Sequence, residues 1–257
     1  MLLEQLRLLI RKIAECYQRL EHYFTSGSFA IKFYPFLMHP CVRNTRSFTI
    51  KVFSVVLIFT GLYYFFGELI SILFSDVGLS SYTKHTTIEL LLPKDFVVNE
   101  KSGSLTPLFY TMQLAFQLQA WNFILGYIIC VTYITGQKLR LLGVLFSLLF
   151  SIGSSIISAS QGGHYSTFGY LQNLGFEVTF LIGNLAMVAI GFAIDNNHIK
   201  RFKYYSIIAG LIGLSCIIST VFITTAYTPW LERISIYSLM IWEISLGFAV
   251  LKAMESK

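Results

Sequence analysis

Charged residues are scarce in this chain of 257 residues, where they make up only 12% of the sequence. Typical soluble domains carry about 25%. Hydrophobic residues account for 55% of the chain and aromatic residues for 16%. This composition excludes an ordinary soluble domain and indicates several membrane spans, each of which needs about 20 apolar residues. The formal net charge of +6 is therefore better explained by membrane orientation than by nucleic-acid binding.

Motifs for catalysis and metal binding are also missing from the sequence. The four cysteines show no CxxC spacing, so they predict neither a zinc site nor a disulfide framework. No HExxH, GxSxG or P-loop sequence occurs. We expect no metal, no cofactor and no nucleic-acid partner, and we favour a non-enzymatic protein over an enzyme.

Six hydrophobic stretches are long enough to cross a bilayer as helices. We place them at about 52–74, 108–134, 141–160, 173–194, 205–226 and 234–253, and the second is long enough to tilt or break. The predicted fold class is an all-α integral membrane protein, a six-helix transmembrane bundle over residues 48–257. Residues 75–107 form its one sizeable loop, with a short apolar run at 88–92.

The N-terminal segment, residues 1–47, is predicted to lie outside the bundle. Apolar residues recur at steps of three and four over residues 1–25, which predicts an amphipathic helix. Such a helix can lie in the headgroup plane and contact anionic lipid, or it can pack on its own protein. Residues 26–47 are expected to be irregular, because Gly27, Pro35, Pro40 and Asn44 disfavour helix.

Basic residues set the predicted orientation. Fifteen lysines and arginines fall on the side of the N-terminus and four on the opposite side. The positive-inside rule then places both termini in the cytoplasm, Gln137 and Asn197 in cytoplasmic loops, and Thr87 outside. We expect a prokaryotic cytoplasmic membrane protein whose partners are the lipid bilayer and, as an open alternative, a membrane-protein partner or a second copy.

Polar residues in or beside the spans are the candidates for ligand binding. A charged residue at the bilayer centre costs at least ~3 kcal/mol on insertion scales, so these residues are expected to face protein or water. They gather in the predicted outer two-thirds of the spans, as an outward-open polar cavity would require. The candidates are Glu68, Gln113, Gln117, Asn122, His164, Glu177, Asn184, Arg233 and Glu243.

Several of these residues also have structural interpretations. Glu68 is close enough to the surface for its carboxylate to reach water. Glu177 and Asn184 are seven residues apart and share one helix face, which could instead bond a neighbouring helix. Glu243 is too deep to reach water, so we expect it to be protonated and to bond Asn184 or Asn122 at the same depth.

Small residues repeat every four positions along the third span. The stripe consists of Gly143, Ser147, Ser151, Ser155 and Ala159. It could line a hydrophilic path, but we favour helix packing, because small residues let two helix backbones approach closely.

The C-terminal half resembles a known family. The run Phe180-Leu181-Ile182-Gly183-Asn184-Leu185-Ala186, then Glu232 to Tyr237 and Trp242, is similar to an uncharacterised prokaryotic membrane family, domain of unknown function 998. The resemblance covers about 141–253 and aligns His164 with a histidine common in that family. It implies a helical membrane fold and no known activity. His164 stands farther from the Gly-Asn pair than in the family pattern, and the usual proline of the preceding loop is absent.

Three functions remain open on these observations. The first is a membrane protein whose outward-facing polar cavity binds or helps move a small polar or lipid-like ligand, with an accessory role in export or self-protection as one form. The second is an intramembrane lipid hydrolase or transferase that uses Glu177 or Glu243 with His164. The third is a structural partner subunit of a membrane complex.

Overall fold

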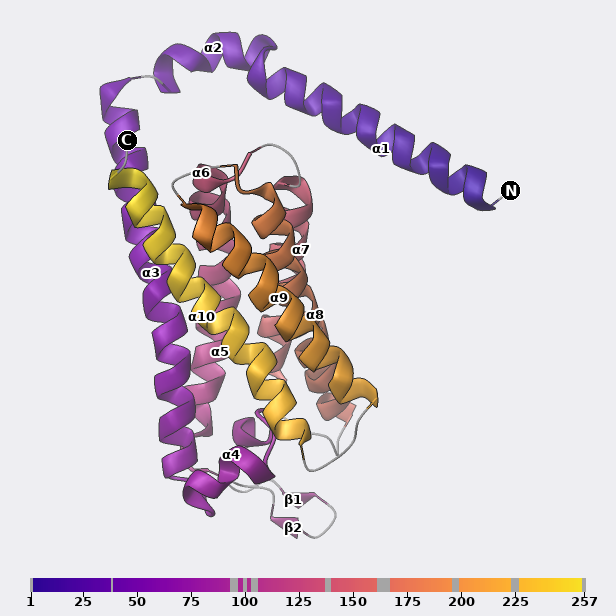
Figure 1. Ribbon diagram of the computed structural model, residues 1–257, viewed down its shortest axis with the longest axis vertical. Helices are drawn as coiled ribbons and strands as arrows, with labels where there is room; N and C mark the ends of the chain where they lie inside the picture. The colour runs from indigo at the N-terminus through magenta and orange to yellow at the C-terminus, as the bar shows by residue number, and fades with distance from the viewer. Residues whose placement is uncertain are drawn as a thin grey trace. The chain divides into compact units, whose positions relative to one another are not determined.

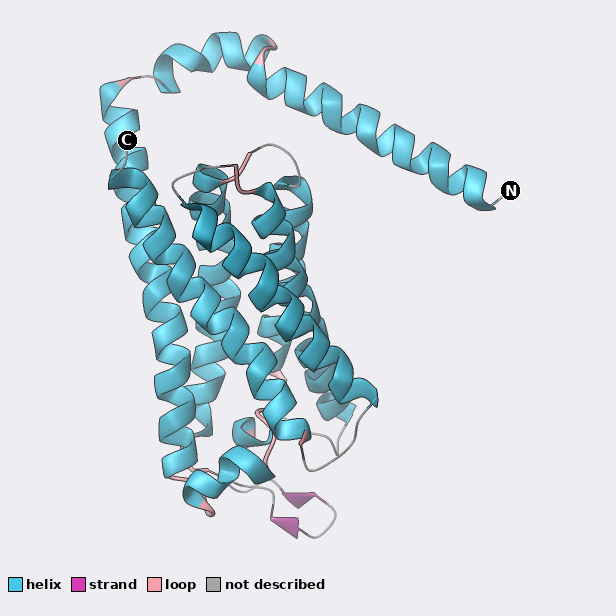
Figure 2. Cartoon of the chain, in the orientation of Figure 1, coloured by secondary structure: helices cyan, strands magenta, loops and turns pink. Residues whose placement is uncertain are grey.

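The computed structural model describes residues 2–37, 39–92, 97–98, 101–102, 106–136, 140–160, 167–195, 199–222 and 227–255. Nearly all of these residues are helical, and one short two-stranded ladder is present among them (Figure 2). By its contacts the chain divides into two units, residues 1–49 and residues 50–257, and each is described by itself.

The N-terminal unit is helical throughout its described length. Helix α1 spans Leu2–Thr25, as the apolar repeat predicts, and α2 spans Ser28–Leu37. The unit ends in the first turns of α3, which runs over Pro40–Leu73. The expectation of irregular structure over residues 26–47 is therefore wrong. Pro40 begins α3 instead of breaking it, because the first residue of a helix needs no amide hydrogen.

Six helices are long and apolar enough to span a membrane, which confirms the predicted bundle. They are α3, α5 (Phe109–Gly126), α7 (Arg140–Ala159), α8 (Thr167–Ala193), α9 (Lys200–Phe222) and α10 (Thr228–Glu255). The second span continues past α5 through a π-helical turn, Tyr127–Val131, into the short helix α6, Thr132–Ile134. The π-helical turn interrupts the regular α-helix of the second span, which was predicted from its length to tilt or break.

Consecutive helices of residues 50–257 pack side by side (Figure 1). Helix α5 contacts α7, α7 contacts α8, α8 contacts α9, and α9 contacts α10. Helix α3 packs against α10 through two glycines. A Cβ atom at Gly61 would come within 2.8 Å of the Met240 carbonyl oxygen, and one at Gly247 within 2.5 Å of the Ser54 carbonyl oxygen. These close approaches place α3 and α10 side by side.

The connection between α3 and α5 covers one end of the bundle, here named the α4 end. It contains the 3-10 turn Gly78–Ser80, helix α4 (Ser81–Lys84), the 3-10 turn Glu89–Leu91, and strands β1 (Val97–Val98) and β2 (Lys101–Ser102), which pair antiparallel. The apolar run is buried: Ile88, Leu90 and Leu91 are at most 2% exposed. This run therefore fills the end of the bundle and contacts α5 instead of forming an open loop.

Candidate functional site

A buried ion pair joins α3 to α10 at the α4 end. Arg233 Nε lies 2.9 Å from Glu68 Oε1, and both side chains are 1% exposed. Tyr237, one turn further along α10, donates its hydroxyl to Glu68 Oε2 at 2.7 Å. The interpretation in which Glu68 reaches water is therefore wrong, since its two oxygens are held by α10 inside the bundle.

The same arginine holds the loop at the α4 end. Arg233 Nη1 donates to the carbonyl oxygens of Tyr82 and His85, each at 2.9 Å. The guanidinium also lies 5.2 Å from the centre of the Tyr82 ring. Next to it in sequence, the buried Glu232 accepts the amide hydrogen of Thr87 at 3.4 Å. Side chains at the start of α10 therefore hold the loop by the loop's backbone groups. Burial of the Tyr82 side chain raises the pKa of its phenol.

A second polar pair lies deeper in the bundle, between α5 and α10. Gln119 Nε2 donates to Glu243 Oε2 at 2.8 Å, and both side chains are fully buried. The expectation that Glu243 bonds Asn184 or Asn122 is wrong. Asn184 donates to Ser235 Oγ at 2.9 Å, and Asn122 donates to Thr60 Oγ1 at 2.9 Å. The sequence prediction gave both amides the wrong partner, and Asn184 meets α10 at Ser235, eight residues from Glu243.

The two asparagines act as helix ties. Asn184 connects α8 to α10 and also donates to the Phe180 carbonyl of its own helix at 2.7 Å. Gly213 of α9 packs against the Asn184 side chain, where a Cβ atom would overlap the amide. Asn122 connects α5 to α3. In the described structure both residues therefore stabilise helix contacts.

The remaining candidates do not join these clusters. Gln117 accepts a hydrogen bond from Ser158 at 2.6 Å, which ties α5 to α7, and Gln113 is half-buried. Glu177 is exposed, although Asn184 on the same face of α8 is fully buried. His164 lies outside the described residues. Arg233 is buried against Glu68 and not against Glu177.

The small-residue stripe of α7 divides into two parts. Gly143 packs against the Tyr127 hydroxyl, Ser147 is buried, and Ser151 donates to the Ala120 carbonyl oxygen of α5. Ser154, outside the predicted stripe, donates to the Phe116 carbonyl oxygen at 2.8 Å. In this part of α7 the small residues therefore lie against α5 and the turn that follows it.

The second part of the stripe is not packed in this way. Ser155 is half-buried and Ala159 is exposed. These two residues line a groove between α5 and α7.

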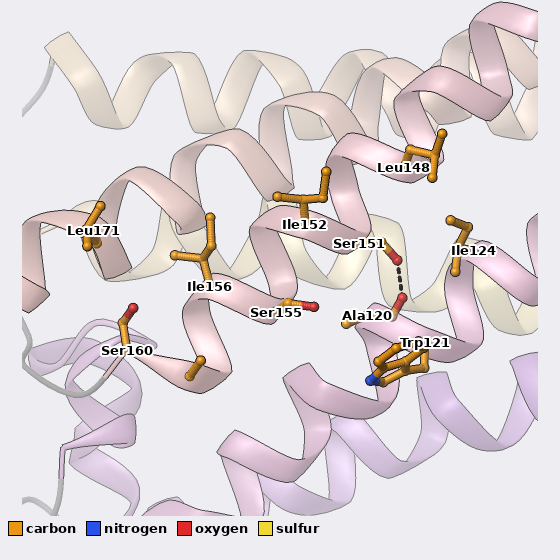
Figure 3. A pocket seen from close by; sticks show the side chains of 11 residues that line it. Ala120, Trp121, Ile124, Leu148, Ser151, Ile152, Ser155, Ile156, Ser160 and Leu171 are labelled. Atoms are coloured by element: carbon orange, nitrogen blue, oxygen red, sulfur yellow. Dashed lines mark hydrogen bonds between the residues drawn. The ribbon is translucent and has the colours of Figure 1, made fainter.

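This groove has a volume of about 540 Å³. Figure 3 shows it with Ser151 and Ser155 on one wall and Trp121 and Ile124 on the facing wall. Trp121 is 62% exposed and Ile152 is 56% exposed, so the groove opens on the outer surface of the bundle. Its lining residues are Ala120, Trp121, Ile124, Leu148, Ser151, Ile152, Ser155, Ile156, Ala159, Ser160 and Leu171.

The buried charged residues could be identified from the sequence, but several of the groups that bond them were missed. Gln119 was not singled out, although it lies on α5 between the candidates Gln117 and Asn122. Its depth is the one signal that could have found it. The carbonyl groups of Tyr82 and His85 carry no side-chain signal at all.

In the described part of the chain, no group of three or more His, Cys, Asp or Glu side chains could hold a metal ion. Comparisons of the chain with protein-family models, with curated proteins and with solved structures find no match.

Proposed function

We propose that this membrane protein binds a lipid-like ligand whose acyl chain lies in the groove between α5 and α7. The observation that carries the proposal is the groove itself, about 540 Å³ of mostly apolar surface that opens sideways from the bundle. Ligand pockets commonly measure about 300–1,000 Å³ and are mostly apolar. The resemblance to domain of unknown function 998 stays a prediction and adds no activity.

The length of the groove fits one leaflet. Its lining along α7 and the residue that follows it runs from Leu148 to Ser160, twelve residues apart. At 1.5 Å per residue this is ~18 Å of helix. Half of a ~30 Å hydrocarbon core is ~15 Å, so a single acyl chain could follow the groove from the α4 end toward the middle of the membrane.

The polar candidates support a lipid-like ligand over a small polar one. Glu68 and Arg233 bond each other, and Asn122 and Asn184 bond neighbouring helices. The atoms that make these bonds would have to give them up to hold a polar ligand. Arg233 Nη2 and Asn184 Oδ1 have no partner among the described residues, but both atoms are buried inside the bundle. A lipid-like ligand in the groove would break no hydrogen bonds of this kind, because the exposed surface of the groove comes mainly from apolar side chains such as Trp121 and Ile152.

Photolabelling in a bilayer tests this proposal. The full chain is reconstituted in nanodiscs with a phospholipid that carries a photoreactive group in one acyl chain, and the adducts are mapped by mass spectrometry. We expect adducts concentrated at Trp121, Leu148 and Ile152 that decrease when unlabelled lipid competes. Adducts spread evenly over the exposed helix faces, or insensitive to competing lipid, would contradict the proposal.

A matched pair of variants makes the test specific. Ser155→Phe places a ring in the groove and should reduce the adducts on α5 and α7 several-fold. Ser215→Phe makes the same change at an exposed site on α9 and should leave them unchanged. If the groove instead binds a helix of a partner subunit, a crosslinkable residue at position 155 will capture protein from native membranes while lipid fails to compete.

A further inference from the structure

The carboxyl group of Glu243 is incompletely satisfied in the core of the bundle. Its Oε2 accepts a hydrogen bond from Gln119 Nε2 at 2.8 Å, while its Oε1 has no hydrogen-bond partner among the described residues. Gln119 Oε1 is also buried and without a partner there. The two side chains thus share one hydrogen bond and leave one acceptor oxygen each without a donor.

No cation in the described residues compensates Glu243. Helix α5 carries no charged residue, and the charged groups of the neighbouring helices are engaged or exposed elsewhere. On α10, Arg233 and Lys252 lie ten and nine residues from Glu243, ~15 and ~14 Å along the axis. Elsewhere in the spanning helices within residues 50–257, Glu68 is paired with Arg233, Glu232 accepts the Thr87 amide hydrogen, and Lys203 donates to the Ile194 carbonyl at 3.2 Å. Arg140 is the first residue of α7. The other exposed charged residues of these helices are Lys51, Glu177, Lys200, Arg201 and Glu255.

A bare carboxylate at this position would be costly. Removing an ion from water carries an effective penalty of several kcal/mol in proteins, and here no opposite charge offsets it. A neutral carboxylic acid avoids this penalty and also gains an O–H donor. That donor is the group that the acceptor oxygen of Gln119 lacks.

We infer that Glu243 is a proton-binding site, which at neutral pH holds a proton taken from solvent and pairs as a carboxylic acid with the Gln119 amide. The proton forms an O–H bond at Glu243 Oε1 and is donated in a hydrogen bond to Gln119 Oε1. The amide returns a hydrogen bond from Nε2 to Oε2, so all four polar positions of the pair are used. The site is independent of the proposed lipid groove, because neither Glu243 nor Gln119 lines that groove.

Infrared spectroscopy of the reconstituted full chain at neutral pH tests this assignment. We expect a carbonyl stretch of a protonated carboxyl group in the wild type that disappears in Glu243→Gln. Glu177→Gln is the matched control, since it removes an exposed carboxyl group and should leave that band unchanged. Loss of an ionised carboxylate band in Glu243→Gln would overturn the inference.

A second measurement tests the pairing and does not depend on the folding of the Glu243 variant. In Gln119→Leu the protonated carbonyl band of Glu243 should shift, because the amide no longer bonds it. Labelling glutamate carboxyl carbons with ¹³C in the wild-type chain gives the protonation state by solid-state NMR with no substitution. An unshifted band in Gln119→Leu, or the absence of a protonated glutamate signal at neutral pH, would contradict the acid–amide pair.

Discussion

Replacing Arg233 with methionine should lower the free energy of unfolding by about 3–5 kcal/mol, the usual cost of leaving one ion of a buried pair alone. The structure puts this site at the severe end of that range. Glu68 is 1% exposed and would retain only the Tyr237 hydroxyl as a partner. The carbonyl oxygens of Tyr82 and His85 would also lose their donor, which loosens the loop at the α4 end.

The double variant separates charge from packing. Glu68→Gln alone leaves the Arg233 guanidinium buried, although the two loop carbonyls still solvate it, so its cost should be smaller than that of Arg233→Met. Glu68→Gln combined with Arg233→Met removes both charges and should be less destabilising than the sum of the single changes. Unfolding in mixed detergent micelles, followed by far-ultraviolet circular dichroism, measures each value.

The control is Glu177→Gln, which removes an exposed carboxylate from α8 and should change stability by less than about 0.5 kcal/mol. The loop provides a second measurement, because limited proteolysis at the α4 end should accelerate in Arg233→Met. If Arg233→Met unfolds within about 1 kcal/mol of the wild type, or if the double variant is simply additive, the ion pair does not stabilise the fold.

Two further predictions concern orientation and packing. A single cysteine at Thr83, exposed on α4, should react with an impermeant reagent added from outside, and one at the exposed Asp195 should react only from inside; reaction of position 195 from outside would reverse the orientation. Thr87 itself is buried and unsuitable for labelling. Ser151→Leu should cost about 1–3 kcal/mol in the same unfolding assay, since Ser151 contacts α5, whereas Ser215→Leu on α9 should be nearly neutral; equal stability of the two variants would disprove close packing at Ser151.

The membrane helices could be predicted because an apolar run of helical length has few alternatives in a bilayer. Their ends could not. Helix α8 begins at Thr167, six residues before the predicted start, because polar residues such as Gln172 continue the helix beyond the hydrophobic run. The burial of Leu90 and Leu91 was missed for a related reason. The run at 88–92 holds only four apolar residues, too few for a span, and the sequence does not reveal what covers them.

In the candidate site, the approximate depth of a polar residue could be predicted, but its hydrogen-bond partner could not. Counting residues along the predicted spans placed Glu68 and Arg233 in the outer two-thirds of the bundle, and the structure pairs them across 165 residues of chain. The same counting placed Asn122 near Glu243, yet it is Gln119 that bonds Glu243. Depth follows from position along a helix, whereas the partner depends on helix rotation, which a single sequence does not determine.

The buried acidic groups have different kinds of hydrogen-bond partner at different depths in the bundle. At the α4 end, the loop brings backbone groups into the bundle: two carbonyls contact Arg233 and one amide contacts Glu232. About ten residues deeper, backbone groups are already used within the helices, as they must be in a bilayer. Glu243 can therefore be satisfied only by side chains, and Gln119 supplies a single donor. A change of charge inside this bundle is consequently expected at Glu243, where gaining or losing a proton alters the pairing, and not at Glu68, whose charge is already balanced.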